Sequence, residues 1–282
     1  MWEVDQQRDV YEQKWALLNR NMRWEVADLL REHYLPAVNA ACEEVHPRDS
    51  FYTAYGKRAL DIAVAAVALG ATLPVNAVIA LVTLVDLGRP IFFRQQRIGK
   101  GGEKFTLVKF RNMREAFDEN GHPLPGAMRV TKLGKIMRRT SLDELLNFWS
   151  ILKGDMSLIG PRPLVPEYFS RYSVRHRART AVKPGLECPP RSGRLPASYD
   201  EQFENDVWYV ENSSFAVDIS LMIRLVQSVL DREDSKKRSA SVKGSFMGYD
   251  ENGAAVDSHS VPMWAIDTVL RRHGLLGSAG RE

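Results

Sequence analysis

Two adjacent carboxylates next to paired arginines are the first feature of this 282-residue chain that suggests chemistry. Arg138 and Arg139 are followed closely by Asp143 and Glu144. A carboxylate held near fixed positive charge stays ionised, and it can attack a phosphorus atom to form an aspartyl phosphate. A second carboxylate can help to hold Mg²⁺, which prefers oxygen ligands and often bridges substrate phosphates. Asp143 is therefore a candidate nucleophile, and Asp143 and Glu144 are the candidate metal ligands.

The same segment also allows a purely structural interpretation. Ser141 and Glu144 have the spacing of a capping box, in which the serine caps a helix and the glutamate bonds back. Asp143 would then complement the dipole of the first turn. A helix N-terminus is also a phosphate site, because its free N–H groups carry positive potential. Both interpretations predict a helix over about residues 142–153, ended by Gly154.

An arginine between two prolines follows, in the stretch Gly160-Pro161-Arg162-Pro163. Proline fixes φ and cannot continue a helix, so Arg162 is expected in a rigid loop. Arginine pairs with phosphate through two parallel hydrogen bonds. Pro161, Arg162 and Pro163 are therefore candidate substrate contacts, and the alternative is an ordinary rigid loop with an exposed arginine.

The net charge of +4 is unevenly distributed. From Arg89 to Arg139 there are 13 Lys/Arg and 4 Asp/Glu, a local excess of +9, so the remainder carries −5. Such a block indicates binding to phosphates, in nucleic acid, a nucleotide or anionic lipid. No base-reading motif is visible, and the apolar run described next does not fit a nucleic-acid binder, so no nucleic-acid partner is expected. The histidines form no HxxxH cluster and the two cysteines are far apart, which argues against a zinc enzyme and a disulfide.

Residues 62–85 form an uncharged apolar run. As a helix it would be about 36 Å long, enough to cross a hydrocarbon core. Pro74 lies at its middle and should kink it. Lys57 and Arg58 precede the run and further cations follow it, which draws both ends towards the cytoplasm. A helix that enters, bends at Pro74 and leaves on the same face satisfies both features; a kinked spanning helix is the alternative. Asp61 is expected to pair with Arg58 or another cation.

The rest of the pattern predicts an α+β chain that is mostly helical. Residues 1–50 form a helical extension, interrupted at Pro36, which is a packing or dimerising arm rather than a membrane-surface helix; a homodimer is thus one partner to consider. Residues 51–232 are expected to form the domain that contains the motifs described above, and residues 233–282 are expected to be a linker and tail. The other predicted elements are strands at 91–93 and 105–108, amphipathic helices at 130–137 and 218–230, and a short helix at 264–273.

Taken in order, these motifs resemble one family. They are KRxxD at 57–61, the apolar run broken at Pro74, RxG at 97–99, KFRNM at 109–113, RRTSLDELLNFW at 138–149, GDMSLIGPRPL at 154–164, KPG at 183–185 and DVWYVEN at 206–212. Their order is similar to that of the bacterial sugar transferase family, the monotopic polyprenol-phosphate phosphoglycosyl transferases. The resemblance covers roughly residues 55–230, and a DE pair followed by GPRP behind a Pro-broken membrane segment is specific to it.

The resemblance implies a small catalytic domain with a re-entrant membrane helix at about residues 59–86, on the cytoplasmic face of the bacterial inner membrane. It implies transfer of a sugar 1-phosphate from a UDP-sugar to undecaprenyl (polyprenol) phosphate through an aspartyl-phosphosugar intermediate, at the start of surface-glycan assembly. Mg²⁺ is the implied cofactor and membrane lipid an implied partner. Asp143 is then the nucleophile and Glu144 its partner. The candidate phosphate contacts are Arg111, Arg138, Arg139 and Arg162.

One segment departs from the family pattern. The KPG motif is usually followed by a stretch like ITGWAQVNGR, whereas residues 186–194 read LECPPRSGR. The loss of aromatic and amide groups puts the sugar preference in doubt. It also motivates a different class of function, a catalytically silent membrane scaffold that recruits assembly partners. The intact DE and GPRP motifs argue against that alternative.

Overall fold

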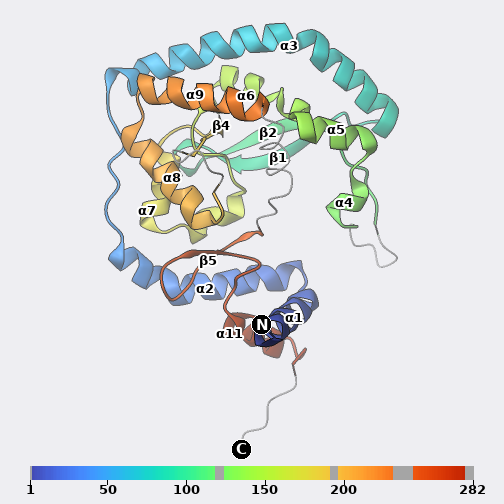
Figure 1. The fold of residues 1–282 in the computed structure, drawn as a ribbon, viewed down its shortest axis with the longest axis vertical. Coiled ribbons are helices and arrows are strands. Elements are labelled where there is room, and N and C mark those ends of the chain that lie inside the picture. Colours follow the sequence, from blue (N-terminus) through green and yellow to red (C-terminus); the bar gives the residue numbers. More distant parts are fainter. Residues whose placement is uncertain (1, 118–123, 191–195, 231–243, 277–282) are drawn as a thin grey trace, which may run out of the picture.

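The computed structural model describes residues 2–117, 124–190, 196–230 and 244–276. Helices predominate in these ranges, and the strands pair into three two-stranded sheets, which confirms the predicted α+β class. Figure 1 shows a larger body, formed by the described residues from 88 to 230, beneath the long helix α3, with a smaller unit below it formed by the first and last described segments.

Helix α3, Lys57–Leu87, continues from the π-helical turn Tyr52–Gly56. Among the described residues, this is the one helix long and apolar enough to cross a membrane. Its buried residues include Asp61, Asn76 and Thr83, whereas several of its large aliphatic side chains are 61% to 80% exposed: Val67, Leu73, Val78, Leu81 and Val85. A helix on the surface of a water-soluble protein has the opposite pattern. Polar groups turned inward and aliphatic groups turned outward are what lipid contact requires.

Pro74 does not interrupt α3, although the ribbon bends and arches over the body (Figure 1). A proline inside a helix removes one backbone donor and clashes with the preceding turn, which bends the helix. The Thr72 hydroxyl also donates to the carbonyl of Ala68 at 2.7 Å, a back-bond that bends helices as well. The predicted break is therefore a bend within a continuous helix.

The start of α3 is fixed to the body by contacts that differ from the prediction. Arg58 does not pair with Asp61: its guanidinium donates to the carbonyls of Ile151 and Leu152 at 2.6 and 2.8 Å. The last carbonyls of a helix have no partner inside it, so a cation there is favoured. Asp61 instead accepts from the backbone of Leu158 at 2.9 Å and from the Ser157 hydroxyl at 3.0 Å.

The body is built on an antiparallel hairpin, β1 Phe92–Ile98 with β2 Lys104–Phe110, which confirms the two predicted strands. A second pair, β3 Ser157–Ile159 and β4 Gly185–Glu187, is parallel. The helices of the body are α4 Gly126–Arg129, α5 Lys132–Thr140, α6 Asn147–Lys153, α7 Val174–Arg177, α8 Tyr199–Asn212 and α9 Phe215–Leu230. Short 3-10 turns lie at Lys100–Gly102, Leu142–Glu144, Pro166–Arg171 and Ala178–Ala181.

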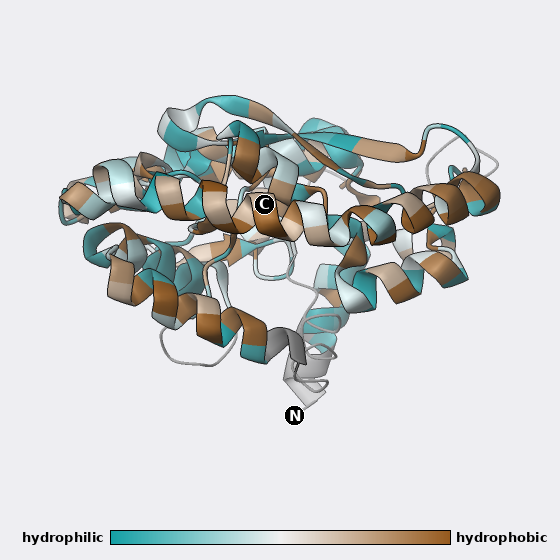
Figure 2. Ribbon diagram, turned by 90° about the horizontal axis from the view of Figure 1, so that it is seen from above, coloured by the Kyte–Doolittle hydropathy of each residue, from teal (hydrophilic) through white to brown (hydrophobic). Residues whose placement is uncertain are grey.

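One apolar core joins α3 to this body. Its buried members come from α3, β2, α6, β3, α8 and α9, and include Ala65, Leu107, Ile151, Ile159 and Tyr209. Next to it the buried carboxylate of Asp218 accepts from Lys57 at 2.6 Å and from the Tyr52 and Tyr209 hydroxyls at 2.5 and 2.6 Å. The first turn of α3 is thereby bound to α9. Figure 2, seen from above, shows hydrophobic residues along both of these helices.

The described segments 2–41 and 244–276 fold together into a terminal unit. Its elements are α1 Trp2–Leu17, α2 Arg20–Ala41, β5 Phe246–Tyr249, β6 Ala255–Asp257 and α11 Met263–Arg272. They share a buried core that includes Val26, Leu30, Met247, Ile266 and Leu270. The predicted linker falls largely on residues 231–243, outside the described residues. Residues 244–276, expected to be a tail, are folded, and the helix predicted at 264–273 is confirmed as α11. Pro36 lies inside α2 and does not interrupt it.

The terminal unit packs against the body through aromatic side chains. Phe246 and Tyr249 of β5 share a buried cluster with Tyr168, Tyr172 and Phe203 of the body. Arg171 links the two parts as well: it donates to the carbonyl of Phe246 at 3.1 Å and lies over the ring of Trp24. The segment that follows the GPRP stretch is thus held between the body and the terminal unit. The N-terminal helices therefore pack within the chain, and a dimerising role stays a prediction.

Candidate active site

A cavity of about 530 Å³ lies between the β1–β2 hairpin, residues 111–115 and the C-terminal end of α5. This volume is in the range of ligand-binding pockets. Its charged lining side chains are five cations, Lys109, Arg111, Arg114, Arg129 and Arg138, and three carboxylates, Glu115, Asp143 and Glu144. The formal excess of two positive charges favours an anionic ligand.

The turn that carries the two carboxylates differs from the predicted capping box. Helix α5 begins at the N-cap Thr131, whose side chain accepts from Gly134, and ends at Ser141 in the left-handed conformation, φ 54°. A positive φ is unusual for a residue other than glycine, and it reverses the chain direction here. The Ser141 side chain makes no capping bond to the 3-10 turn that follows, and α6 starts only at Asn147. Asp143 therefore lies in a tight turn, not at the N-terminus of an α-helix.

Asp143 lines the cavity although only 7% of its surface is exposed. Its Oδ2 accepts a hydrogen bond from Asn112 Nδ2 at 2.9 Å. Burial raises the pKa of this carboxyl above its ordinary value, and the neighbouring charge of Glu144 raises it further. A more basic carboxylate is the better nucleophile, provided that it is deprotonated.

Glu144 is in the opposite electrostatic environment. Its Oε1 accepts from Lys109 Nζ at 2.5 Å and from Arg162 Nη2 at 3.0 Å. Burial opposes ionisation of Glu144, but the charges of Arg162 and Lys109 outweigh it and lower the pKa to about 2. Two neighbouring carboxyl groups whose pKa values are displaced in opposite directions are the usual sign of divided roles in a catalytic pair.

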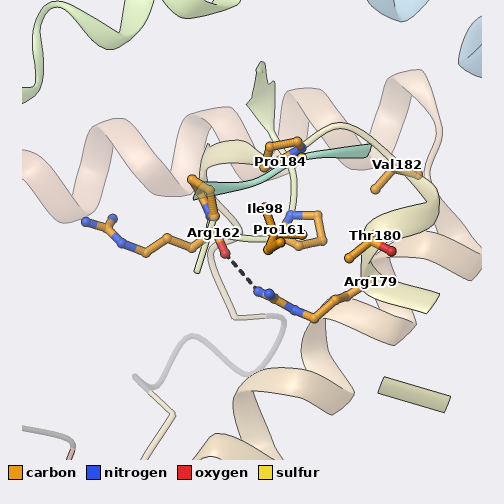
Figure 3. Close-up of a pocket in the computed structure, with 9 residues that line it drawn as sticks. Ile98, Pro161, Arg162, Arg179, Thr180, Val182 and Pro184 are labelled. Carbon is orange, nitrogen blue, oxygen red and sulfur yellow. Dashed lines mark hydrogen bonds between the residues drawn. The ribbon is translucent and has the colours of Figure 1, made fainter. Parts of the chain in front are cut away.

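Arg162 reaches this pair from the GPRP stretch. Its Nη1 also donates to Glu187 of β4 at 3.0 Å, so the guanidinium bridges two carboxylates. Figure 3 shows the side chain pointing away from a small cavity of about 10 Å³, while its carbonyl accepts from Arg179 Nη2 at 2.8 Å. Pro161 and Pro163 line that small cavity and not the large one. The two prolines restrict the backbone on both sides of Arg162. Because neither proline lines the large cavity, the structure gives no support to the prediction that they contact substrate.

Of the other predicted phosphate contacts, Arg111 and Arg138 line the large cavity, whereas Arg139 does not. Arg138 lines the cavity, and Arg111 lines it while donating to the carbonyls of Leu87 and Gly88 at the end of α3. Arg111 Nε is buried without a hydrogen-bond partner among the described residues, which leaves a donor for a ligand. Arg139 is exposed and does not line the cavity, so its predicted role is not supported by the structure.

The structure also brings in residues to which the sequence assigned no role. Lys109 and Asn112 belong to the KFRNM motif, of which Arg111 alone was selected. Their position at the end of a predicted strand was the available signal, because strand ends commonly carry site residues. No sequence signal pointed to Arg129 or Glu187, since their neighbours in the site come from distant segments.

The carboxylate pair fits the expected Mg²⁺ in its donor chemistry. The described residues contain no group of three or more His, Cys, Asp or Glu that could hold a metal ion by themselves. Mg²⁺ is commonly held by one or two carboxylates, with water and substrate phosphates as its other ligands. Asp143 and Glu144 on the cavity wall supply such a pair.

Comparison with known proteins adds to this geometry. Residues 52–232 match the family described as bacterial sugar transferase. A Bacillus subtilis protein named "Uncharacterized sugar transferase EpsL" is 38% identical over 193 residues, 68% of this chain and 96% of that protein. The UDP-glucose:undecaprenyl-phosphate glucose-1-phosphate transferase of Caulobacter vibrioides is 32% identical over 190 residues, 64% of this chain and 71% of that protein.

The UDP-N-acetylgalactosamine-undecaprenyl-phosphate N-acetylgalactosaminephosphotransferase of Aeromonas hydrophila is 33% identical over 186 residues. The matched region is 63% of this chain but only 44% of that protein, so the chain spans less than half of this relative. The family match leaves out α1, α2, β5, β6 and α11, which make up the terminal unit.

Proposed function

The chain belongs to the bacterial sugar transferase family, and from this premise we propose that it moves a sugar 1-phosphate from a UDP-sugar to undecaprenyl phosphate. The observation that carries the proposal is the pair Asp143 and Glu144, held with opposite pKa displacements on the wall of a cationic cavity. The names of the Caulobacter and Aeromonas relatives describe the same transfer. Such a product would begin the assembly of a surface polysaccharide or glycoprotein glycan.

In the first step, a carboxylate oxygen of Asp143 attacks the sugar-bearing phosphorus of the donor. A new oxygen–phosphorus bond forms, the bond from that phosphorus to the bridging oxygen breaks, and UMP leaves with the electron pair. Asp143 is preferred to Glu144 because the charge of Glu144 is already neutralised by Lys109 and Arg162. Positioning and charge neutralisation provide most of the catalysis in phosphoryl transfer.

In the second step, a phosphate oxygen of undecaprenyl phosphate attacks the same phosphorus. The aspartyl–phosphorus bond breaks, the Asp143 carboxylate is restored, and undecaprenyl diphosphate sugar leaves. Arg138 and Arg111 on the cavity wall are placed to bind phosphate oxygens in both steps. Mg²⁺ bound by Asp143 and Glu144 would supply further neutralisation of the diphosphate charge.

We also propose that α3 is re-entrant, with the catalytic body on the cytoplasmic face of the inner membrane. Both ends of the helix are tied to the same body: Arg58 at the start bonds to α6, and Leu87 at the end accepts from Arg111. A straight span would place these ends on opposite sides of the bilayer. The test is cysteine labelling at residues 55 and 89 in a variant with Cys42 and Cys188 replaced by serine. Labelling of both sites from one face is expected, and labelling from opposite faces would contradict the hairpin.

The transferase activity is tested by UMP release from a panel of UDP-sugars with Mg²⁺ and undecaprenyl phosphate. Asp143→Asn should abolish release, and a radiolabelled sugar phosphate should remain on the wild-type protein when the acceptor is left out. Asp28→Asn, on the half-exposed side of α2 in the terminal unit, is the matched control and should keep full activity. Full-rate release by Asp143→Asn would remove the nucleophile assignment.

A silent scaffold remains the second candidate function, because one observation favours it. Glu187 lies in the stretch that departs from the family pattern, and it occupies one side of Arg162. Residues 191–194 of that stretch lie outside the described residues. Absence of UMP release and of a covalent adduct with every UDP-sugar in the panel would favour this reading over the enzyme.

A further inference from the structure

We propose that Asn112 is a positioning residue, which holds Asp143 and Arg138 in one fixed arrangement for the transfer step. The inference rests on the proposed function, because it assigns Asn112 a part in the same reaction. Asn112 lines the cavity within the KFRNM motif, two residues after the end of β2 at Phe110.

The hydrogen bonds determine the orientation of the Asn112 amide. Arg138 donates from Nε at 3.2 Å and from Nη2 at 3.0 Å to one amide atom. Because a guanidinium has only donors, that atom must be the oxygen. The amide nitrogen then faces Asp143 Oδ2 at 2.9 Å, and it can only donate. The two neighbours, one with donors alone and one with acceptors alone, therefore require both ends of an asparagine.

The base of the Asn112 side chain is held by close backbone packing against α5. The Asn112 carbonyl accepts from the backbone of Thr131 at 3.4 Å. A Cβ added at Gly134 would lie 2.1 Å from the same carbonyl oxygen, so only glycine permits this approach. The start of helix α5, which carries Arg138, thus packs directly against the backbone of Asn112, the residue that contacts Asp143.

These hydrogen bonds limit the motion of the Asp143 carboxylate and of the Arg138 guanidinium. A hydrogen bond on Oδ2 restricts rotation of the Asp143 carboxylate and so sets the direction of its other oxygen. The paired bonds from Arg138 fix its guanidinium on the same wall of the cavity. Small errors in the placement of a nucleophile reduce rates strongly, so loss of these restraints should lower kcat more than it raises KM.

Asn112→Asp is the decisive variant because it keeps the shape and the acceptor for Arg138 but cannot donate to an ionised Asp143. We expect kcat for UMP release to fall about 10- to 100-fold, the effect of losing one hydrogen bond to a charged group, with KM for the UDP-sugar within about threefold of wild type. Asn112→Ala should lose at least as much. Asn212→Ala, at an amide that donates to the Trp208 carbonyl in α8, is the matched control with wild-type kinetics.

A purely structural role for Asn112 predicts a different result. If it only braced α5, Asn112→Asp would keep or strengthen the contact to Arg138, and kcat would stay at the wild-type value; that outcome overturns the proposal. A double-mutant cycle with Arg138→Ala adds a second criterion. The two losses should be non-additive, because the residues act through one contact, whereas additive losses would contradict the coupling.

A measurement without substrate separates this inference from the proposed function. In protein labelled at asparagine, the side-chain NH₂ resonance of Asn112 should be displaced from that of exposed asparagines and should move when Asp143 is replaced by alanine. An unmoved resonance overturns the positioning role even in an active enzyme. Absence of UMP release by the wild type, together with the expected resonance shift, would contradict the proposed function and leave the Asn112 contact established.

Discussion

Replacement of Phe246 by alanine should destabilise the transferase body, although Phe246 lies outside the family match. The ring is fully buried, and its centroid lies between 5.1 and 5.8 Å from five aromatic rings, those of Tyr168, Tyr172, Tyr199, Phe203 and Tyr249. Four of these rings belong to the body and one to the terminal unit. Removing Phe246 would leave a cavity at the junction of the two parts.

The size of the effect follows from this burial. A fully buried phenylalanine replaced by alanine costs about 3–5 kcal/mol, through lost transfer free energy and an unfilled cavity. For a chain of this size, each kcal/mol lowers the melting temperature by roughly 2–4 °C. The expected decrease for Phe246→Ala is therefore on the order of 10 °C.

Thermal unfolding of purified protein in one detergent, followed by circular dichroism at a fixed scan rate, measures this decrease. Phe117→Ala is the matched control: Phe117 is 58% exposed, and its replacement should change the free energy of unfolding by less than about 0.5 kcal/mol. A melting temperature for Phe246→Ala within about 2 °C of the wild type would refute the docking of the terminal unit on the body.

Three further predictions concern the site and the membrane helix. The rate of UMP release should fall as the pH decreases through the raised pKa of Asp143, because a protonated carboxyl cannot attack. The rate should begin to fall at a higher pH than it would for an aspartate with the ordinary pKa of 3.8. A pH series of initial rates measures this. Lys57→Met leaves the buried charge of Asp218 without its cation and should destabilise the protein by about 3–5 kcal/mol, whereas Lys57→Met combined with Asp218→Leu should recover much of this loss in thermal unfolding. Chelation by EDTA should stop UMP release and added Mg²⁺ should restore it; activity that persists in EDTA would contradict the metal assignment.

The position of the cavity relative to α3 connects the proposed site with the proposed membrane contact of this helix. The cavity lies beside the end of this helix, because Arg111 lines the cavity and also donates to the carbonyl of Leu87. Asp86, next to Leu87, lies 3.5 Å from Arg114 of the same cavity wall. A phosphate carried on a lipid in the bilayer would therefore meet cations of the site near the point where the helix ends.

Features that depend on local residue order could be predicted from the amino-acid sequence. A long run without charge favours a helix that is removed from water, so the long apolar helix α3 was predictable from residues 62–85 alone. The hairpin strands were predictable because a glycine-rich turn separates two apolar runs. Asp143 and Glu144 could be selected because adjacent carboxylates beside arginines are chemically unusual, and the motif order specified the family.

Contacts between residues far apart in the chain could not be predicted from the sequence, because they depend on how the elements pack. The sequence favoured a capping box at Ser141, but contacts of the turn with β2 and Arg162 gave a left-handed residue and a 3-10 turn instead. Residues 244–276 resembled a tail because their few apolar side chains cannot form a core alone. Helices α1 and α2, more than 200 residues away, supply the other side chains of that core. The proposed role of Asn112 could not be predicted for the same reason. Its amide can bridge a donor and an acceptor only because the fold places Arg138 on one side of it and Asp143 on the other.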